Sequence, residues 1–150
     1  MAGDASPGAM GVDEIAAAMR VAGADRRRSQ ELLASLFADQ VAIRHVPPAP
    51  TDTMVPRDVI VDVAAREVAA LARALPDAEH GDADVTVEGD TVRVRSRTIG
   101  TLRDGTPIDV LTNTCFTVAG GRIVALQSEM DAASADAWRT VLAAGEPGTG

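Results

Sequence analysis

The spacing of apolar residues changes once along the chain, and this change limits the possible folds more than any other feature. From residue 12 to about residue 75, apolar residues recur at intervals of three and four, which is typical of amphipathic helices. From about Ala83 to Met130 they alternate with polar residues, which is typical of strands with one buried face. Helices that precede a block of strands indicate an α+β fold with the helices on one face of an antiparallel sheet.

Two helices are expected at the start of the chain. The first covers about residues 12–26, and the three arginines at 26–28 are expected at its end, where positive charge interacts favourably with the helix macrodipole. Ser29 can cap the second helix. A short strand over residues 40–46 follows, and the two prolines after it end this strand because proline cannot donate a hydrogen bond to a neighbouring strand.

A long helix and a four-stranded meander are expected in the rest of the chain. The helix begins after Pro56 and ends near Leu75, since the proline that follows cannot continue it. Four antiparallel strands come next, with glycine-containing turns between them that supply positive φ angles. These turns are Glu88-Gly89-Asp90, Asp104-Gly105 and Gly120-Gly121. A last helix begins at Asp131 or Ser134, either of which can cap it.

The length of 150 residues fits one domain with a single core. We expect a disordered tail over residues 1–11, a single domain over 12–144 and a second disordered tail over 145–150. The N-terminal segment lacks the apolar stretch of a signal peptide, and no segment reads as a membrane span. The single cysteine, Cys115, rules out an internal disulfide. These features predict a cytoplasmic protein.

The composition excludes several kinds of chemistry. All 14 basic residues are arginines, so a lysine Schiff base and a P-loop lysine are both impossible. Tyrosine is absent as well, which removes the phenol as a general acid. The net charge of −8 and the presence of only two phenylalanines and one tryptophan argue against nucleic-acid binding and against an anionic membrane surface.

Three segments of the chain resemble the nuclear-transport-factor-2-like superfamily: LFADQVAIRHVPP, VRVRSR and GTLRDGTPIDVLTNTCFTVAGGRIVALQSEMD. The similarity covers about residues 12–143 and is to the branch of SnoaL-like polyketide cyclases, ketosteroid isomerases and limonene epoxide hydrolases. It implies a cone-shaped α+β barrel, in which a curved antiparallel sheet wraps around a long helix beside N-terminal helices. It also implies a pocket for a small hydrophobic ligand and a homodimer packed through the sheet. No cofactor or metal ion is expected.

Most catalytic residues of the resembled enzymes have no counterpart here. The positions that activate water in the epoxide hydrolases fall on Ile43, His45, Arg95, Arg97 and Ser128. Of these positions, only Arg95 has the residue type of the hydrolases. Arg97 and Ser128 stand where the hydrolases have their two aspartates, so no carboxylate remains there to accept a proton from water, and this hydrolase mechanism is not expected. Ketosteroid isomerase uses a tyrosine to stabilise its oxyanion, and this chain has none.

His45 and Ser128 are the candidates for catalysis. The unperturbed pKa of histidine lies near neutrality, so His45 can act as a general acid or base, or hold a ligand. The alternative is a histidine bonded to a neighbouring carbonyl, or one at the rim of the pocket. Ser128 can donate a hydrogen bond to a ligand, but no base beside it in the sequence indicates a nucleophile. The resemblance implies that further ligand contacts come from Thr112, Thr114, Phe116 and Met130.

Arg95 and Arg97 have two possible orientations. The alignment with the family points both side chains into the pocket, where they would attract a carboxylate or an enolate. The alternation in VRVRSR instead points the arginines outward, where they would pair with Asp109 or Glu129 on neighbouring strands.

Two functions remain open. The first is a small enzyme, an isomerase, cyclase or hydrolase, that acts on a hydrophobic oxygenated metabolite. The second is a ligand-binding or assembly module that keeps the fold without catalysis.

The acidic segment over residues 79–84 lacks the ligand spacing of a calcium loop and is expected to be a solvated linker.

Overall fold

The computed structural model describes residues 11–23, 25–48, 52–81 and 84–146. Most of the expected N-terminal tail and residues 147–150 of the expected C-terminal tail therefore lie outside the described residues.

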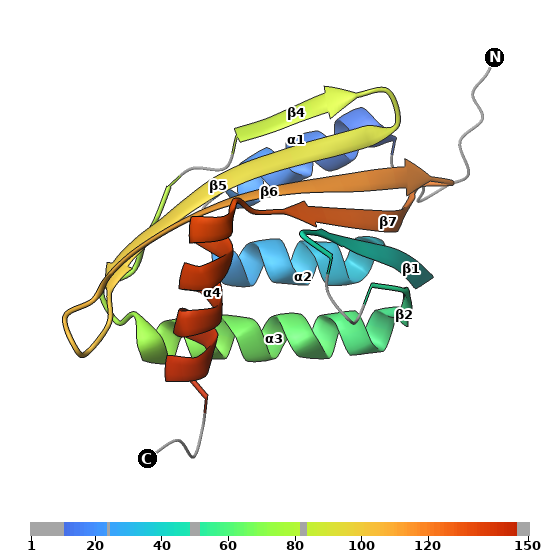
Figure 1. Cartoon of the computed structure of the whole chain (residues 1–150). Helices are drawn as coiled ribbons and strands as arrows, with labels where there is room; N and C mark the ends of the chain where they lie inside the picture. Colours follow the sequence, from blue (N-terminus) through green and yellow to red (C-terminus); the bar gives the residue numbers. More distant parts are fainter. Residues whose placement is uncertain (1–10, 24, 49–51, 82–83, 147–150) are drawn as a thin grey trace.

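Four helices form in the described part of the chain: α1 (Val12–Ala22), α2 (Arg26–Leu36), α3 (Arg57–Ala74) and α4 (Ala132–Ala144). Figure 1 shows α1, α2 and α3 stacked one beneath the other beside the sheet, with α4 running across one end. α4 contacts both α3 and strand β6 (Pro107–Ala119). None of the helices in these residues is both long and apolar enough to span a membrane.

The boundary between α1 and α2 differs from the prediction. α1 ends at Ala22 because Gly23 adopts a φ of 54°, a conformation that favours glycine and stops a helix. Asp25, not Ser29, caps α2, since its side chain accepts a hydrogen bond of 3.1 Å from the Arg28 N–H. The arginines at 26–28 therefore begin α2 and do not end α1, so their interpretation as a favourable macrodipole contact is wrong.

Within the described residues, seven strands form one curved sheet: β1 (Phe37–Val46), β2 (Met54–Pro56), β3 (Glu79–His80), β4 (Asp84–Glu88), β5 (Thr91–Thr101), β6 and β7 (Arg122–Glu129). Their order is β2-β1-β7-β6-β5-β3, and β4 pairs with β5 as well. The predicted antiparallel meander from β4 to β7 is confirmed. The sheet as a whole is mixed, because β1 lies parallel to β7 and not antiparallel as expected.

Part of the segment that was predicted to be a linker, residues 79–81, pairs with the sheet. Glu79 and His80 form the short strand β3, which pairs with β5 in a register that places His80 opposite Thr98. The N–H of Gly81 continues the pairing with a 2.9 Å hydrogen bond to the Arg97 carbonyl. Two residues are too few to show an alternating pattern, which is why the sequence did not predict this strand.

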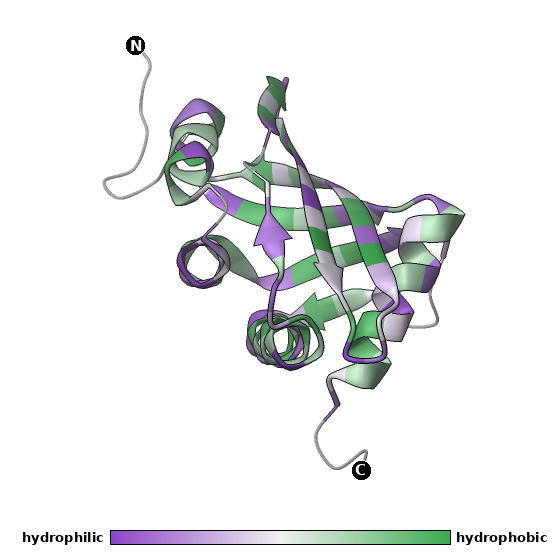
Figure 2. Cartoon of the chain, turned by 90° about the vertical axis from the view of Figure 1, so that its left-hand side faces the viewer, coloured by the Kyte–Doolittle hydropathy of each residue, from purple (hydrophilic) through white to green (hydrophobic). Residues whose placement is uncertain are grey.

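The core consists of two clusters on the side of the sheet that faces the helices. Figure 2 shows the alternation of apolar and polar residues along the strands that produces this buried face. Fully or almost fully buried members of the first cluster include Ile15, Val41, Val92 and Ile123. The second joins the end of α3 to α4 and β6 through Leu71, Leu75, Val110 and Val141. Burial of each such side chain contributes about 1.5–3 kcal/mol, so the strands around the site are firmly held.

Candidate functional site

A pocket of about 620 Å³ lies between the sheet and the helices. Its walls combine apolar side chains from α1, α2 and α4 with polar side chains from the strands. The sequence-predicted residues that line it are His45, Arg97, Thr112, Thr114, Phe116, Ser128 and Met130. Arg95 is exposed and lies outside this lining.

The polar side of the pocket is built by the register of the strands. His45 on β1 lies opposite Ser128 on β7, and Ser128 lies opposite Thr114 on β6. Residues that are directly paired point to the same face of a sheet, so these three side chains form a row across the pocket. A second pair of hydroxyls lies beside this row, where Ser96 and Thr112 are hydrogen-bonded at 2.8 Å.

His45 is held by a carboxylate. Its Nδ1 lies 2.6 Å from Oδ1 of Asp52, and its backbone N–H donates to the same oxygen at 3.1 Å. An ionised carboxylate can only accept, so Nδ1 carries the hydrogen and Nε2 of the neutral ring is left as the acceptor. The side chains are 39% and 22% exposed, so the pair is partly shielded from water and still reachable from the pocket. This arrangement differs from the alternative of a histidine bonded to a carbonyl.

Asp52 reaches His45 because the chain turns back on itself. After the proline-rich loop, β2 pairs antiparallel with β1, with Ala42 opposite Met54. The N–H of Ile43 donates to the Thr53 carbonyl at 3.0 Å and continues this hairpin toward the loop. The sequence carried only one hint of this contact, which is that a short proline-rich loop after a strand often closes a hairpin.

Ser128 has no activating base in the structure. Within the described residues, its hydroxyl makes no hydrogen bond to a histidine or a carboxylate. The row of directly paired residues nevertheless makes it the neighbour of His45 in the pocket. The geometry suits a hydroxyl that binds a ligand oxygen and does not suit a nucleophile.

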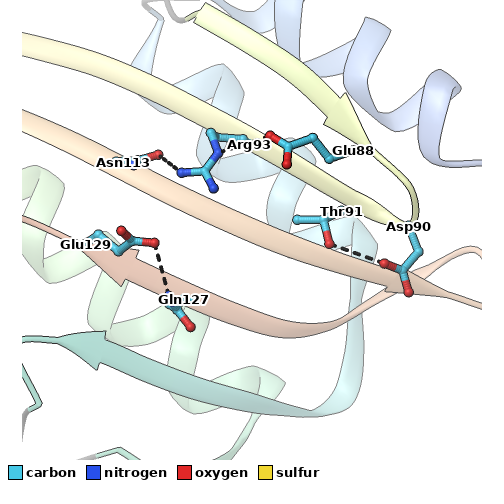
Figure 3. A network of polar contacts seen from close by, with 7 residues as sticks. All are labelled: Glu88, Asp90, Thr91, Arg93, Asn113, Gln127 and Glu129. Atoms are coloured by element: carbon cyan, nitrogen blue, oxygen red, sulfur yellow. Dashed lines mark hydrogen bonds and ion pairs between the residues drawn. The ribbon is translucent and has the colours of Figure 1, made fainter.

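The arginines of β5 occupy the outer face of the sheet. Arg97 donates to both carboxylate oxygens of Asp109, from Nε at 2.8 Å and from Nη2 at 2.6 Å. This hydrogen bonding lowers the pKa of Asp109 and raises that of Arg97. Arg93 lies on the same face, where it donates to Asn113 at 3.0 Å (Figure 3). Arg97 therefore has the outward orientation that alternation predicted. Its guanidinium pairs with Asp109, although the residue also contributes to the pocket lining.

His80 also lines the pocket, and sequence reasoning did not predict this. Its Nδ1 lies 3.1 Å from Oγ1 of Thr98, a residue that is only 2% exposed. The chain contains two histidines, His45 and His80, and both of them line this pocket. Across the described segments, no group of three or more His, Cys, Asp or Glu side chains is arranged to hold a metal ion.

Several solved structures share the fold. One is a candidate SnoaL-like polyketide cyclase from Jannaschia sp. CCS1, with a TM-score of 0.57, 21% identity and coverage of 89% of this chain and 99% of that chain. Another is a protein with a ketosteroid isomerase-like fold from Catenulispora acidiphila, in complex with trimethylamine (TM-score 0.52, 22% identity, coverage 81% and 88%). A third is a candidate isomerase from Bacillus subtilis (TM-score 0.56, 17% identity, coverage 81% and 90%). At these identities the similarity shows the fold alone.

The family follows from the sequence itself. No curated protein matches the chain. The model of the SnoaL-like domain matches residues 12–126, a segment that contains α1 to α3, most of the sheet and the His45–Asp52 pair. The protein therefore belongs to the SnoaL-like domain family, within the nuclear-transport-factor-2-like fold.

Proposed function

We propose that the protein is an acid/base enzyme, of the isomerase or cyclase type, that acts on a small and largely apolar oxygenated metabolite. The observation that carries this proposal is the 2.6 Å contact between His45 and Asp52 at the wall of the pocket. A histidine whose Nδ1–H is held by a carboxylate presents Nε2 as a base in a fixed orientation.

The proposed reaction is a proton transfer next to a carbonyl group. Nε2 of His45 removes a proton from the carbon beside the carbonyl. The electron pair of the broken C–H bond forms a carbon–carbon double bond, and the π pair of the carbonyl moves onto its oxygen to give an enolate. In the proposed reaction, the hydroxyls of Ser128 and Thr114, which lie in the same row, donate hydrogen bonds to this oxygen. The imidazolium, stabilised by Asp52, then returns the proton to another carbon of the same molecule as the carbonyl group forms again. In a cyclase, the enolate carbon instead attacks a second carbonyl of the same molecule, and the oxygen of that carbonyl takes the proton from the imidazolium.

The apolar part of the pocket supports this chemistry. Leu32 and Leu33 on α2 and Trp138 on α4 line the pocket with Phe116 and Val94 from the sheet. Apolar walls exclude water and strengthen the hydrogen bonds made inside them. Two structures with this fold are described as a candidate polyketide cyclase and a candidate isomerase, which agrees with carbonyl chemistry.

A general test does not require the natural substrate. The probe 5-nitrobenzisoxazole loses a ring C–H proton to a base while its N–O bond breaks, and the product is a coloured cyanonitrophenolate. We expect the protein to accelerate this reaction and His45→Gln to lower the acceleration by about 100-fold or more, the range typical of a lost general base. Arg44→Gln is the matched control, because Arg44 is the exposed neighbour on the same strand.

The second candidate function is a non-catalytic ligand-binding module. It is favoured by Ser128, which stands where the resembled hydrolases have a catalytic aspartate. In that case His45→Gln and the unchanged protein would act on the benzisoxazole at equal rates. Ligand binding itself can be followed by fluorescence, because Trp138 is the only tryptophan of the chain and lines the pocket.

A further inference from the structure

We infer that the solvent-facing side of α3 is a self-association surface, on which a second copy of this chain docks with its own α3 running antiparallel. We call this surface the α3 face, and it consists of Val59, Asp62, Arg66, Ala69 and Arg73, all of them exposed. The inference does not depend on the chemistry of the pocket. It also concerns a different side of the molecule from the outer face of the sheet, where the family resemblance predicts a homodimer.

The position of α3 leaves one of its sides open. α3 lies at the outer end of the stack of three helices (Figure 1), and among the described residues its neighbours are α2, α4, β1 and β2. The members of the α3 face recur at intervals of three and four residues, so they form one line along the helix. With a rise of 1.5 Å per residue, this line is about 21 Å long, enough for a helix–helix contact of four turns.

The centre of this line has exposed apolar surface. Val59 is 48% exposed, and Val63, one turn further along and beside the line, is 46% exposed. Ile60 and Leu71 on the core side of the same helix are at most 9% exposed. Ala69 is small and lets a second helix approach closely. A helix packed on the α3 face would therefore remove valine surface from water.

The charges of the α3 face have opposite signs at its two ends. Asp62 and the adjoining exposed Asp58 lie in the first half of the helix, and Arg66 and Arg73 lie in the second half. A parallel copy would place like charges together, whereas an antiparallel copy places the acidic half on the basic half. The surface is thus complementary to itself in the antiparallel orientation, as a two-fold symmetric contact requires.

The charges also define the register of the two helices. With the two-fold axis level with Ala64, Asp62 of each copy lies opposite Arg66 of the other, and Val59 lies at the level of Ala69 of the other. The carboxylate and guanidinium are 59% and 77% exposed and already pair within one helix at 2.6 Å. Both side chains are thus free to turn toward a second copy, and the symmetry makes each contact twice.

The association is expected to be weak. One helix from each copy forms a contact smaller than the roughly 1,200 Å² at which stable complexes begin. Sedimentation equilibrium of the wild-type protein from about 10 µM to about 1 mM should therefore show a mass that rises toward twice its low-concentration value.

Charge exchange between copies tests the contact. Asp62→Arg gives each copy two arginines at the centre of the α3 face, and Arg66→Asp gives each copy two aspartates there. Each variant alone should raise the dissociation constant by about 10-fold or more, because like charges then face each other. A one-to-one mixture of the two variants places arginines opposite aspartates and should restore association at least to the wild-type level.

The mixture separates self-association from effects within the helix. The helix macrodipole and the pairing of residues 62 and 66 favour the same distribution of charge inside one chain, but mixing changes neither of them. Glu31→Arg is the matched control, since it makes the same charge change in the exposed Arg27–Glu31 pair of α2 and should leave the mass unchanged.

Three results would overturn the inference. The first is a wild-type mass that does not rise with concentration. The second is an unchanged dissociation constant in both Asp62→Arg and Arg66→Asp. The third is a mixture of these two variants that associates no better than either variant alone, which would exclude the antiparallel contact of two α3 faces.

Discussion

His45 and Asp52 are joined by two hydrogen bonds to the same carboxylate oxygen, one from the imidazole Nδ1 at 2.6 Å and one from the backbone N–H at 3.1 Å. The backbone bond holds the Asp52 carboxylate beside β1, and the side-chain bond orients the imidazole ring relative to that carboxylate. Both bonds depend on the hairpin of β1 and β2, which brings residues seven positions apart into contact.

Asp52→Asn should lower the rate on the benzisoxazole probe by about 10-fold or more, mainly in kcat. The asparagine amide can donate to Nδ1, which would move the ring hydrogen to Nε2 and remove the base. Steady-state kinetics of the purified variant measure this effect. Asp62→Asn, an exposed carboxylate on α3 that pairs with Arg66, is the control and should leave kcat unchanged. A kcat equal to wild type in Asp52→Asn would contradict the proposed role of the pair.

Asp109→Asn should weaken the decrease of Tm that the protein shows as the pH falls into the acid range. The hydrogen bond from Arg97 lowers the pKa of Asp109 in the folded protein, so this carboxylate stabilises the fold above its unfolded pKa of about 3.9. That stabilisation is lost as the pH falls through the lower folded pKa. The variant should therefore melt below wild type at pH 7 and approach it near pH 2, as measured by Tm.

Arg97→Gln should weaken the pH dependence of Tm in the same way, because it removes the other member of the ion pair. Both side chains are more than half exposed, so the effect at pH 7 should be small and should shrink further in high salt. A variant with the pH dependence of the wild type would show that this pair does not contribute to stability.

Asp131→Ala should lower the free energy of unfolding by about 1 kcal/mol, the usual cost of a lost helix cap. The Asp131 side chain accepts a 2.7 Å hydrogen bond from the Ser134 N–H at the start of α4. Urea denaturation measures the change. Asp136→Ala is the control within the same helix, since the Asp136 side chain pairs with Arg139 at the exposed surface, and it should cost less than about 0.5 kcal/mol. Equal effects of the two variants would refute the assignment of the cap.

Gly145→Ala should lower the free energy of unfolding by about 1–3 kcal/mol, the range for overpacking in a closed contact. A Cβ on Gly145 would overlap the backbone carbonyl of Ala70, and backbone cannot move aside as a side chain can. The Gly145 carbonyl also accepts a 2.6 Å hydrogen bond from Arg73 on α3. Gly81→Ala is the control, because its Cβ would meet only ordinary contacts. Thermal melting of both variants decides the question.

The fold could be predicted from the sequence to a large extent, because the hydrophobic period identifies helices and half-buried strands directly. α3, the meander from β4 to β7 and α4 with its cap at Asp131 lie where the periods and turn residues indicate. The errors occur where local signals compete. Asp25 caps α2 in place of Ser29, and β1 begins at Phe37, three residues before the expected start. The homodimer implied by the family and the cytoplasmic location stay predictions.

The sequence by itself determined the fold class, the absence of lysine and tyrosine chemistry, and the choice of His45 as a candidate catalytic residue. Only the tertiary structure decided which group contacts that histidine, because Asp52 reaches it through the pairing of β1 with β2, which no period encodes. The same holds for His80, whose two-residue strand is defined by its pairing with β5 and not by its own residues. Contacts of this kind depend on where the chain folds back, and folding back is set by packing across the whole sheet, not by any local pattern of residues.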